Sequence, residues 1–278
     1  MKKISRRSFM AAAAVSVAAL ALTACGGSAS SAASSVASSA ASSEAASSAA
    51  AAALSTVEAG KLTMATNATF PPYEMTTDSG EIEGIDVDTA KAIAEKLGLE
   101  LQIDDMEFDA ALLSVQQGKA DIVMAGVTVT DERKAVMDFS DSYATGIQSI
   151  IVPNDSDIAS PDDLAGKKIG TQRGTTGYIY CSDDFGEDSV VAYDSGLTAV
   201  QALNNGQVDA VVIDNAPATE YVAANPGLKV LDTSYAEEDY AIGMAKGSAL
   251  EDAVNKALEE LKADGTLQAI VDKYINAN

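Results

Sequence analysis

The sequence predicts an α/β protein built as two similar lobes, each a mostly parallel sheet flanked by helices. Short apolar strands alternate with amphipathic helices from residue 61 onward, and this alternation indicates parallel sheets covered on both faces. The segment Ala111–Val123 is also echoed by Ala199–Val211. Each copy contains a helix, a glycine stop and an aspartate that opens a buried strand. The offset, from residue 111 to residue 199, is too long for a solenoid repeat and fits two lobes.

The first 25 residues are typical of an export signal and not of a folded domain. Four basic residues among the first seven precede an apolar run from Phe9 to Leu22, which is short for a membrane span. Leu22 to Cys25 reads Leu-Thr-Ala-Cys and resembles the lipobox of bacterial lipoproteins. The resemblance implies cleavage before Cys25 and an acyl lipid such as palmitate on it, and the alternatives are an uncleaved anchor or a coincidental cysteine. Arg6-Arg7 also fits a twin-arginine signal, so the export route stays open.

Residues 26–57 are nearly all Ser, Ala and Gly, with Glu44 as the single charge. Such a segment has little to bury, so we expect a flexible tether between a membrane lipid and the folded body. Its alanine content leaves open whether part of it is helical.

The charge balance bears on the partners of the folded body, which has about 220 residues. The whole chain carries −23, and removing the leader leaves 14 basic against 41 acidic residues, a net charge of −27. This argues against nucleic-acid binding and against direct adhesion to an anionic membrane. We expect a monomer that reaches the membrane only through the lipid on Cys25. Cys181 then has no disulfide partner and is expected to be a partly buried small residue of undefined role.

The order of elements follows from apolar spacing and turn residues. Strands are expected at 61–66, 100–104, 122–125, 147–152, 168–171, 190–193, 208–213, 228–231 and 240–245. Helices are expected at 84–97, 109–117, 197–205 and 219–224, from 131, 160 and 174, and as an amphipathic pair from 250 broken at Asp264-Gly265. Asp86 or Asp88 can cap the first helix and Gly98 can end it. Two prolines, Pro71 and Pro72, hold the preceding loop.

The residue types present exclude several chemistries. The chain has no His and no Cys pair, which argues against a metal site and removes a Ser/His/Asp triad. No glycine-rich loop matches a phosphate or dinucleotide motif, so no cofactor is expected. Carboxylate acid–base chemistry stays open, because 41 acidic residues offer many pairs, but no spacing singles out a catalytic residue.

Ligand-type side chains gather at element ends in both lobes. They are Asn67, Phe70, Phe108, Gly126, Thr128 and Arg133 in the first, and Gln172, Arg173, Thr175, Thr176 and Asp214 in the second. In the first lobe, the predicted strand at 122–125 is followed by small residues from Gly126 and, about one helical turn later, by Arg133. This arrangement suits the capture of an anion at the carboxyl end of a strand. Each residue also has a structural interpretation: Arg133 as a solvated helix residue, the phenylalanines as core, and Thr175, Thr176 and Asp214 as helix caps.

Five blocks in order resemble the polar amino-acid-binding proteins of ABC importers, the family 3 extracellular solute-binding proteins. The blocks are Ala65–Tyr73, Gly84–Ala94, Met124–Asp141, Gly174–Thr176 and Asp209–Asp214. The resemblance implies a two-lobed, type II periplasmic-binding fold with a two-strand hinge. It places one lobe at 58–144 with 242–278 and the other at 145–241. It also implies delivery of a captured amino acid to an ABC permease whose identity the sequence leaves open.

The family's pattern implies a role for each site residue. Arg133 grips the α-carboxylate with the backbone N–H groups of Thr128 and Thr176, with Thr175 beside them at the helix start. Asp214 takes the α-ammonium with the Gly126 carbonyl and the Thr128 hydroxyl. Phe70 and Phe108 sandwich the side chain, which Asn67 and Gln172 approach.

One departure concerns the ligand: members that take cationic side chains commonly carry Asp where this chain has Asn67. The uncharged amide favours an uncharged polar ligand such as glutamine, and Glu107 or another acid keeps arginine and lysine open. Two other functions fit the same fold, an extracytoplasmic dehydratase with a catalytic acid in the cleft, and a ligand sensor without an importer.

Overall fold

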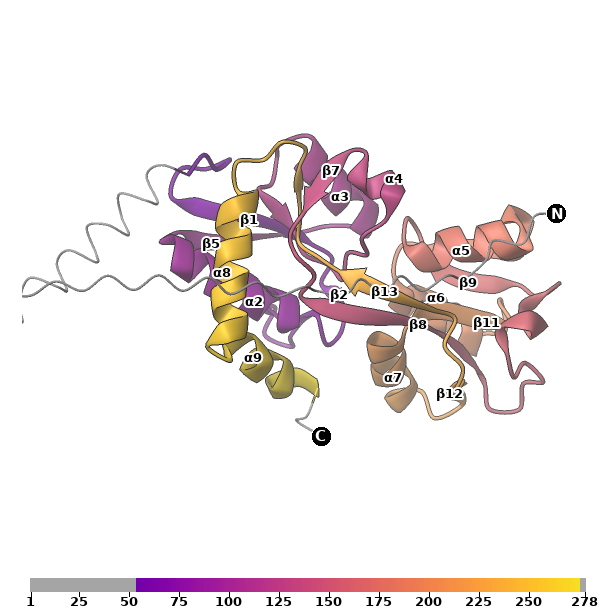
Figure 1. The fold of residues 1–278 in the computed structure, drawn as a ribbon. Helices are drawn as coiled ribbons and strands as arrows, with labels where there is room; N and C mark the ends of the chain where they lie inside the picture. Colours follow the sequence, from indigo (N-terminus) through magenta and orange to yellow (C-terminus); the bar gives the residue numbers. More distant parts are fainter. Residues whose placement is uncertain (1–53, 276–278) are drawn as a thin grey trace, which may run out of the picture.

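A computed structural model of the chain describes residues 54–275. The export signal, Cys25 and nearly all of the expected tether lie outside these residues. Two mixed sheets form two lobes side by side, with helices packed on both faces of each sheet (Figure 1). The predicted two-lobed α/β fold is confirmed, but the prediction of mostly parallel sheets is wrong, because the strands next to the lobe crossing and those from the end of the chain pair antiparallel. Within residues 54–275, no helix has both the length and the apolar character that crossing a bilayer requires.

The sheet of lobe 1 takes its strands from before residue 140 and after residue 242. In sheet order they are β5 (Glu100–Asp105), β1 (Lys61–Thr66), β6 (Ile122–Val123), β14 (Gly243–Ala245) and β7 (Met137–Phe139). The first three are parallel, whereas β14 runs antiparallel to both neighbours. The predicted proline loop contains a small sheet of β2 (Thr69–Phe70), β3 (Glu74–Thr76) and β4 (Ile82–Glu83).

Helices cover both faces of the lobe 1 sheet. They are α2 (Ile85–Leu97), α3 (Phe108–Gln116), the short α4 (Asp131–Lys134), α8 (Glu251–Ala263) and α9 (Thr266–Ile275). Met64 and Ile122 pack in the cluster that also holds residues of α2 and α8, whereas Ala65 and Val123 pack in the cluster of α3. The expected aspartate cap of α2 is wrong, because Gly84 is the N-cap and no side chain caps this end.

The sheet of lobe 2 comes from the chain between these segments. Its strands, in sheet order, are β10 (Val190–Tyr193), β9 (Ile169–Gln172), β11 (Ala210–Asp214), β8 (Ala144–Pro153) and β12 (Leu228–Val230), and β13 (Ala236–Tyr240) also pairs with β8. Its helices are α5 (Thr176–Phe185), α6 (Gly196–Asn204) and α7 (Asn215–Ala223), with short 3₁₀ turns at Pro161–Leu164 and Glu187–Ser189. The helix α7 begins earlier than predicted, since Pro217 lies in its first turn, where a missing N–H costs little.

The sequence echo has a structural meaning in both lobes. The stop glycines Gly118 and Gly206 have φ of 66° and 68°, a left-handed conformation that favours glycine. The Asp121 carboxylate accepts the backbone N–H of Thr63 on β1 at 2.8 Å. The Asp209 carboxylate likewise accepts the N–H of Lys168, just before β9, at 2.8 Å. Each aspartate thus ties the start of one buried strand to its parallel neighbour.

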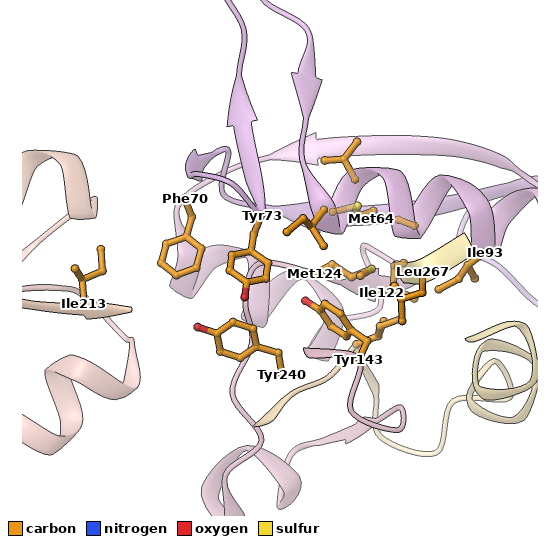
Figure 2. Packing of buried hydrophobic residues seen from close by; sticks show 14 of the residues in the cluster. Met64, Phe70, Tyr73, Ile93, Ile122, Met124, Tyr143, Ile213, Tyr240 and Leu267 are labelled. Atoms are coloured by element: carbon orange, nitrogen blue, oxygen red, sulfur yellow. The ribbon is translucent and has the colours of Figure 1, made fainter. Parts of the chain in front are cut away.

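The two lobes are joined by β8 and β13, which pair antiparallel and run between them (Figure 1). The strand expected at 240–245 is therefore two strands, because β13 belongs to the second sheet and β14 to the first. At the crossing, the Tyr73 ring lies 5.8 Å from Phe70 and 5.3 Å from Tyr240 between ring centroids. Figure 2 shows these three rings clustered on the lobe 1 side, with Ile213 of lobe 2 beyond them.

We expect Gly146→Ala to destabilise the hinge. A Cβ at Gly146 would lie 2.5 Å from three atoms of the Tyr240 side chain, which is fully buried. Overpacking of this kind costs about 1–3 kcal/mol, and thermal unfolding measures it.

Gly227→Ala is the matched control, because a Cβ there meets nothing within 4 Å. Equal melting temperatures for the two variants would show that Tyr240 can move aside.

Candidate ligand-binding site

A small cavity lies between the lobes. Its lining is Asn67, Phe70, Glu74, Phe108, Ala125, Gly126, Thr128, Arg133, Gln172, Thr175, Thr176 and Asp214. All ten residues that the sequence singled out as ligand-binding lie in this lining. Arg173, grouped with them at first, is half exposed and pairs with Asp194.

Arg133 is buried and not a solvated helix residue. It lies in α4, which begins after Thr130, whose hydroxyl accepts the Arg133 backbone N–H. Its Nη1 donates to the Thr128 carbonyl at 2.7 Å, and its Nη2 donates across the cleft to the Gly174 carbonyl at 3.1 Å. The Phe108 ring centroid lies 5.4 Å from Cζ, a cation–π distance. Burial lowers the pKa of the guanidinium, and the Glu238 carboxylate opposes that shift.

The start of α5 faces Arg133 from lobe 2. Thr175 is the N-cap, and its hydroxyl accepts the Tyr178 N–H and donates to the Gln172 carbonyl. Thr176 is the first helical residue, and its hydroxyl lies 3.4 Å from that of Thr128. The cap interpretation of Thr175 is thus confirmed, and the free N–H groups of a helix start favour a negative group beside Arg133.

Asp214 ends β11 and is held by two neutral donors. Gln148 Nε2 donates to Oδ2 at 2.7 Å, and the Tyr240 hydroxyl donates to Oδ1. Asp214 occupies the N-cap position of α7 without its side chain making a cap hydrogen bond. Burial, and next the charge of Glu238, raise the pKa of this carboxyl well above its ordinary value. Positive charge placed at Asp214 would favour the carboxylate.

Asn67 is committed to protein contacts. Its Nδ2 donates to the Met106 carbonyl at 2.9 Å, and its Oδ1 accepts from Thr69 Oγ1 at 2.9 Å and from Gln172 Nε2 at 2.8 Å. The last bond joins lobe 1 to lobe 2. The Asn67 amide therefore serves contact between the two lobes. For this reason, its lack of charge says less about the charge of the ligand than the sequence suggested.

Glu74 is the lining residue that sequence reasoning missed. It is fully buried, and neither carboxyl oxygen has a hydrogen-bond partner in the protein. Burial and then the nearby Asp86 carboxylate raise its pKa well above the ordinary value, and burial raises the pKa of Asp86 to about 6. The sequence offers only the closeness of Glu74 to Phe70, a predicted site residue, and the structure pairs these two residues across the β2–β3 hairpin.

Two further groups lie apart from the cavity. Cys181 is fully buried in the lobe 2 core, whereas the sequence led us to expect partial burial, and burial raises its pKa to about 12. Within residues 54–275, no cluster of three or more His, Cys, Asp or Glu side chains has the arrangement of a metal site.

Comparison with protein families gives one match that covers most of the chain. Residues 62–277 match the family described as bacterial extracellular solute-binding proteins, family 3. Among curated proteins, the L-cystine-binding protein TcyJ of Escherichia coli K12 is 33% identical over 225 residues, covering 80% of this chain and 85% of that protein. A probable histidine-binding protein of Neisseria gonorrhoeae is 34% identical over 272 residues, covering 95% and 94%.

Solved structures of amino-acid-binding proteins are also similar to this chain. The arginine-, lysine-, histidine-binding protein ArtJ of Geobacillus stearothermophilus superposes with a TM-score of 0.75 at 35% identity, covering 78% of this chain and 96% of that one. An ancestral arginine-binding protein bound to glutamine gives a TM-score of 0.73 at 42% identity, covering 78% and 98%.

We expect the empty protein to become more stable as the pH falls from 8 toward 5, in part through Glu74. A carboxyl whose pKa is raised by folding binds its proton more tightly in the folded state. This stabilisation is complete below the unfolded pKa, about 4.3 for Glu, and is lost as the pH rises through the folded value. Glu74→Gln should therefore raise the melting temperature at pH 8 and flatten its pH dependence.

Glu237→Gln removes the same charge from an exposed position and corrects for general repulsion in this acidic protein. If Glu74→Gln and Glu237→Gln gave the same pH dependence, Glu74 would not be the buried acid responsible.

Proposed function

This chain belongs to the bacterial extracellular solute-binding proteins of family 3, and from that premise we propose that it captures a polar amino acid between its lobes for an ABC importer. Members of the family bind solutes, so the chain is a binding protein and not an enzyme. The observation that carries the proposal is the cavity with Arg133 from lobe 1 and Asp214 from lobe 2 in its lining.

Opposite charges from opposite lobes suit the backbone of an amino acid. A zwitterion taken out of water needs both of its charges paired. We propose that Arg133, with the start of α5, holds the α-carboxylate, and that Asp214, Thr128 and the Gly126 carbonyl hold the α-ammonium. The ligand then touches both lobes and favours their closed arrangement. The predicted division into 58–144 with 242–278 and 145–241 is part of this proposal.

The cavity favours a basic side chain on that amino acid. Within residues 54–275, Arg133 is the only buried basic side chain, while Glu74, Asp86, Asp214 and Glu238 are buried acids. Glu74 lines the cavity with two unpaired oxygens, and a guanidinium or ammonium would satisfy them. We therefore favour arginine or lysine over the uncharged ligand that Asn67 suggested. The names of the arginine- and histidine-binding relatives accord with this choice.

A position at the cell surface is the next part of the proposal. We propose that a lipid on Cys25 anchors the chain outside the cytoplasmic membrane, with residues 26–57 as tether. The export-type leader and the family description support this placement. An ABC permease is the proposed recipient of the ligand.

Calorimetry against the common amino acids tests the proposal. The protein without residues 1–25, stripped of carried-over ligand by unfolding and refolding, should bind a basic amino acid with micromolar or tighter affinity. Arg133→Ala should weaken binding by about a hundredfold or more, because a charge-assisted pair is lost from a buried site.

Arg173→Ala makes the same chemical change at a half-exposed side chain outside the cavity lining and should leave the affinity unchanged. Failure of the wild-type protein to bind any amino acid would refute the proposed function, and an unaffected Arg133→Ala variant would refute the site.

A basic ligand should also displace a proton at Glu74. Because the pKa of Glu74 is raised in the empty site, arginine that pairs with its carboxylate should release protons, so affinity should rise with pH between 6 and 8. Calorimetry in buffers of different ionisation enthalpy counts these protons. Glu74→Gln should reduce the release, leaving the part that the ligand ammonium causes at Asp214, and should weaken arginine binding about tenfold or more, with a much smaller effect on glutamine. Equal effects on both ligands would contradict the assignment of a basic ligand.

A further inference from the structure

Two buried side chains on the hinge strands lie behind the cavity and outside its lining. Gln148 of β8 is 2% exposed and Glu238 of β13 is 6% exposed. Neither lines the cavity, but each contacts a residue that does. Neither residue belongs to the site that the sequence predicted.

The hydrogen-bond direction at Gln148 follows from its neighbours. Nε2 lies 2.7 Å from Asp214 Oδ2 and 3.0 Å from Glu238 Oε2. An amide nitrogen carries two protons and so matches two acceptor oxygens, whereas the amide oxygen in that place would face two carboxylates. Gln148 therefore donates one amide proton to each of the two acids.

The hydrogen-bond direction at Thr128 follows in turn. Its hydroxyl lies 3.0 Å from the same Glu238 Oε2. A carboxylate only accepts hydrogen bonds, and a hydroxyl has one proton to give. With that proton directed to Glu238, the Thr128 hydroxyl offers only lone pairs to the cavity.

The backbone keeps this arrangement in place. Thr128 forms a bridge with Tyr240, the Val129 N–H donates to the Asp239 carbonyl at 3.0 Å, and the Ala241 N–H donates to the Val127 carbonyl at 3.1 Å. The segment that carries Thr128 is thus paired with the strand end next to Glu238. No ligand is needed to bring the two side chains together.

We propose that Glu238 is a positioning residue for ammonium recognition: by holding the Thr128 proton, it makes the Thr128 hydroxyl an obligatory acceptor beside Asp214. This inference rests on the proposed function. It attributes the selectivity of the site for an α-amino group to Glu238 acting through Thr128. An ammonium supplies a proton to each of these acceptors. An α-hydroxyl supplies only one, so a 2-hydroxy acid leaves a buried acceptor unpaired, and buried unpaired groups are costly.

The test compares L-arginine with the 2-hydroxy acid that bears the same side chain, by calorimetry on the full chain without its signal. If the amino-acid panel gives tighter binding of L-glutamine, glutamine and its 2-hydroxy analogue replace them. The readout is the ratio of the two dissociation constants. In Glu238→Leu, the carboxylate that accepts the Thr128 proton is absent and that proton is free, so the ratio should fall about tenfold. Glu237→Leu, on the exposed face of the same strand, should keep the wild-type ratio.

Combining Glu238→Leu with Thr128→Val checks that the effect runs through the Thr128 hydroxyl. Once the hydroxyl is absent, Glu238→Leu should produce no further change in the ratio. If Glu238→Leu does not fold, Thr128→Val should lower the ratio while Thr128→Ser keeps it.

Each failure has its own signature. Wild-type protein that binds no amino acid would refute the proposed function. Wild-type selectivity together with a Glu238→Leu variant that weakens both ligands equally would overturn only the positioning role. A Thr128→Val variant with the wild-type ratio would overturn it as well.

Discussion

A zwitterion that leaves water for a closed cavity loses the hydration of both charges, and only close pairing offsets that cost. For the proposed amino-acid ligand, this requirement accounts for the presence of Arg133 from one lobe and Asp214 from the other in the cavity lining, to which lobe 1 also adds Glu74. It also explains the neutral donors around Asp214, since Gln148 and Tyr240 can stabilise a carboxylate without neutralising it. Because burial raises the pKa of Asp214, a positive group placed beside it would favour the carboxylate form.

The hinge strands contribute chemistry as well as connection. The strand β8 supplies Gln148 and β13 supplies Glu238 and Tyr240, and all three hydrogen-bond to Asp214 or Thr128 in the cavity lining. The Asn67–Gln172 bond and the Arg133–Gly174 bond hold the lobes together at other points of the cleft. Residues that shape the site and residues that join the lobes therefore overlap, so a change at the hinge alters recognition.

The sequence predicted the parts of this structure that depend on local patterns. The aspartates of the internal echo, Asp121 and Asp209, mark the starts of buried strands because each binds the backbone of its neighbour. Arg133 and Asp214 were found because they follow strands at motif spacing. Glu74 and Glu238 were missed, since their burial depends on contacts between distant segments and their neighbours in sequence resemble ordinary surface strands. The same limit applied to Asn67, whose partner Gln172 lies in the other lobe.

The order of strands in lobe 1 has a consequence for biosynthesis. Its sheet places β14, residues 243–245, between β6 and β7, which come from the first half of the chain. Lobe 2 is continuous and can pair all of its strands from residues 144–240. During translation, lobe 1 therefore stays incomplete until nearly the whole chain has been made, because contacts between distant segments form late.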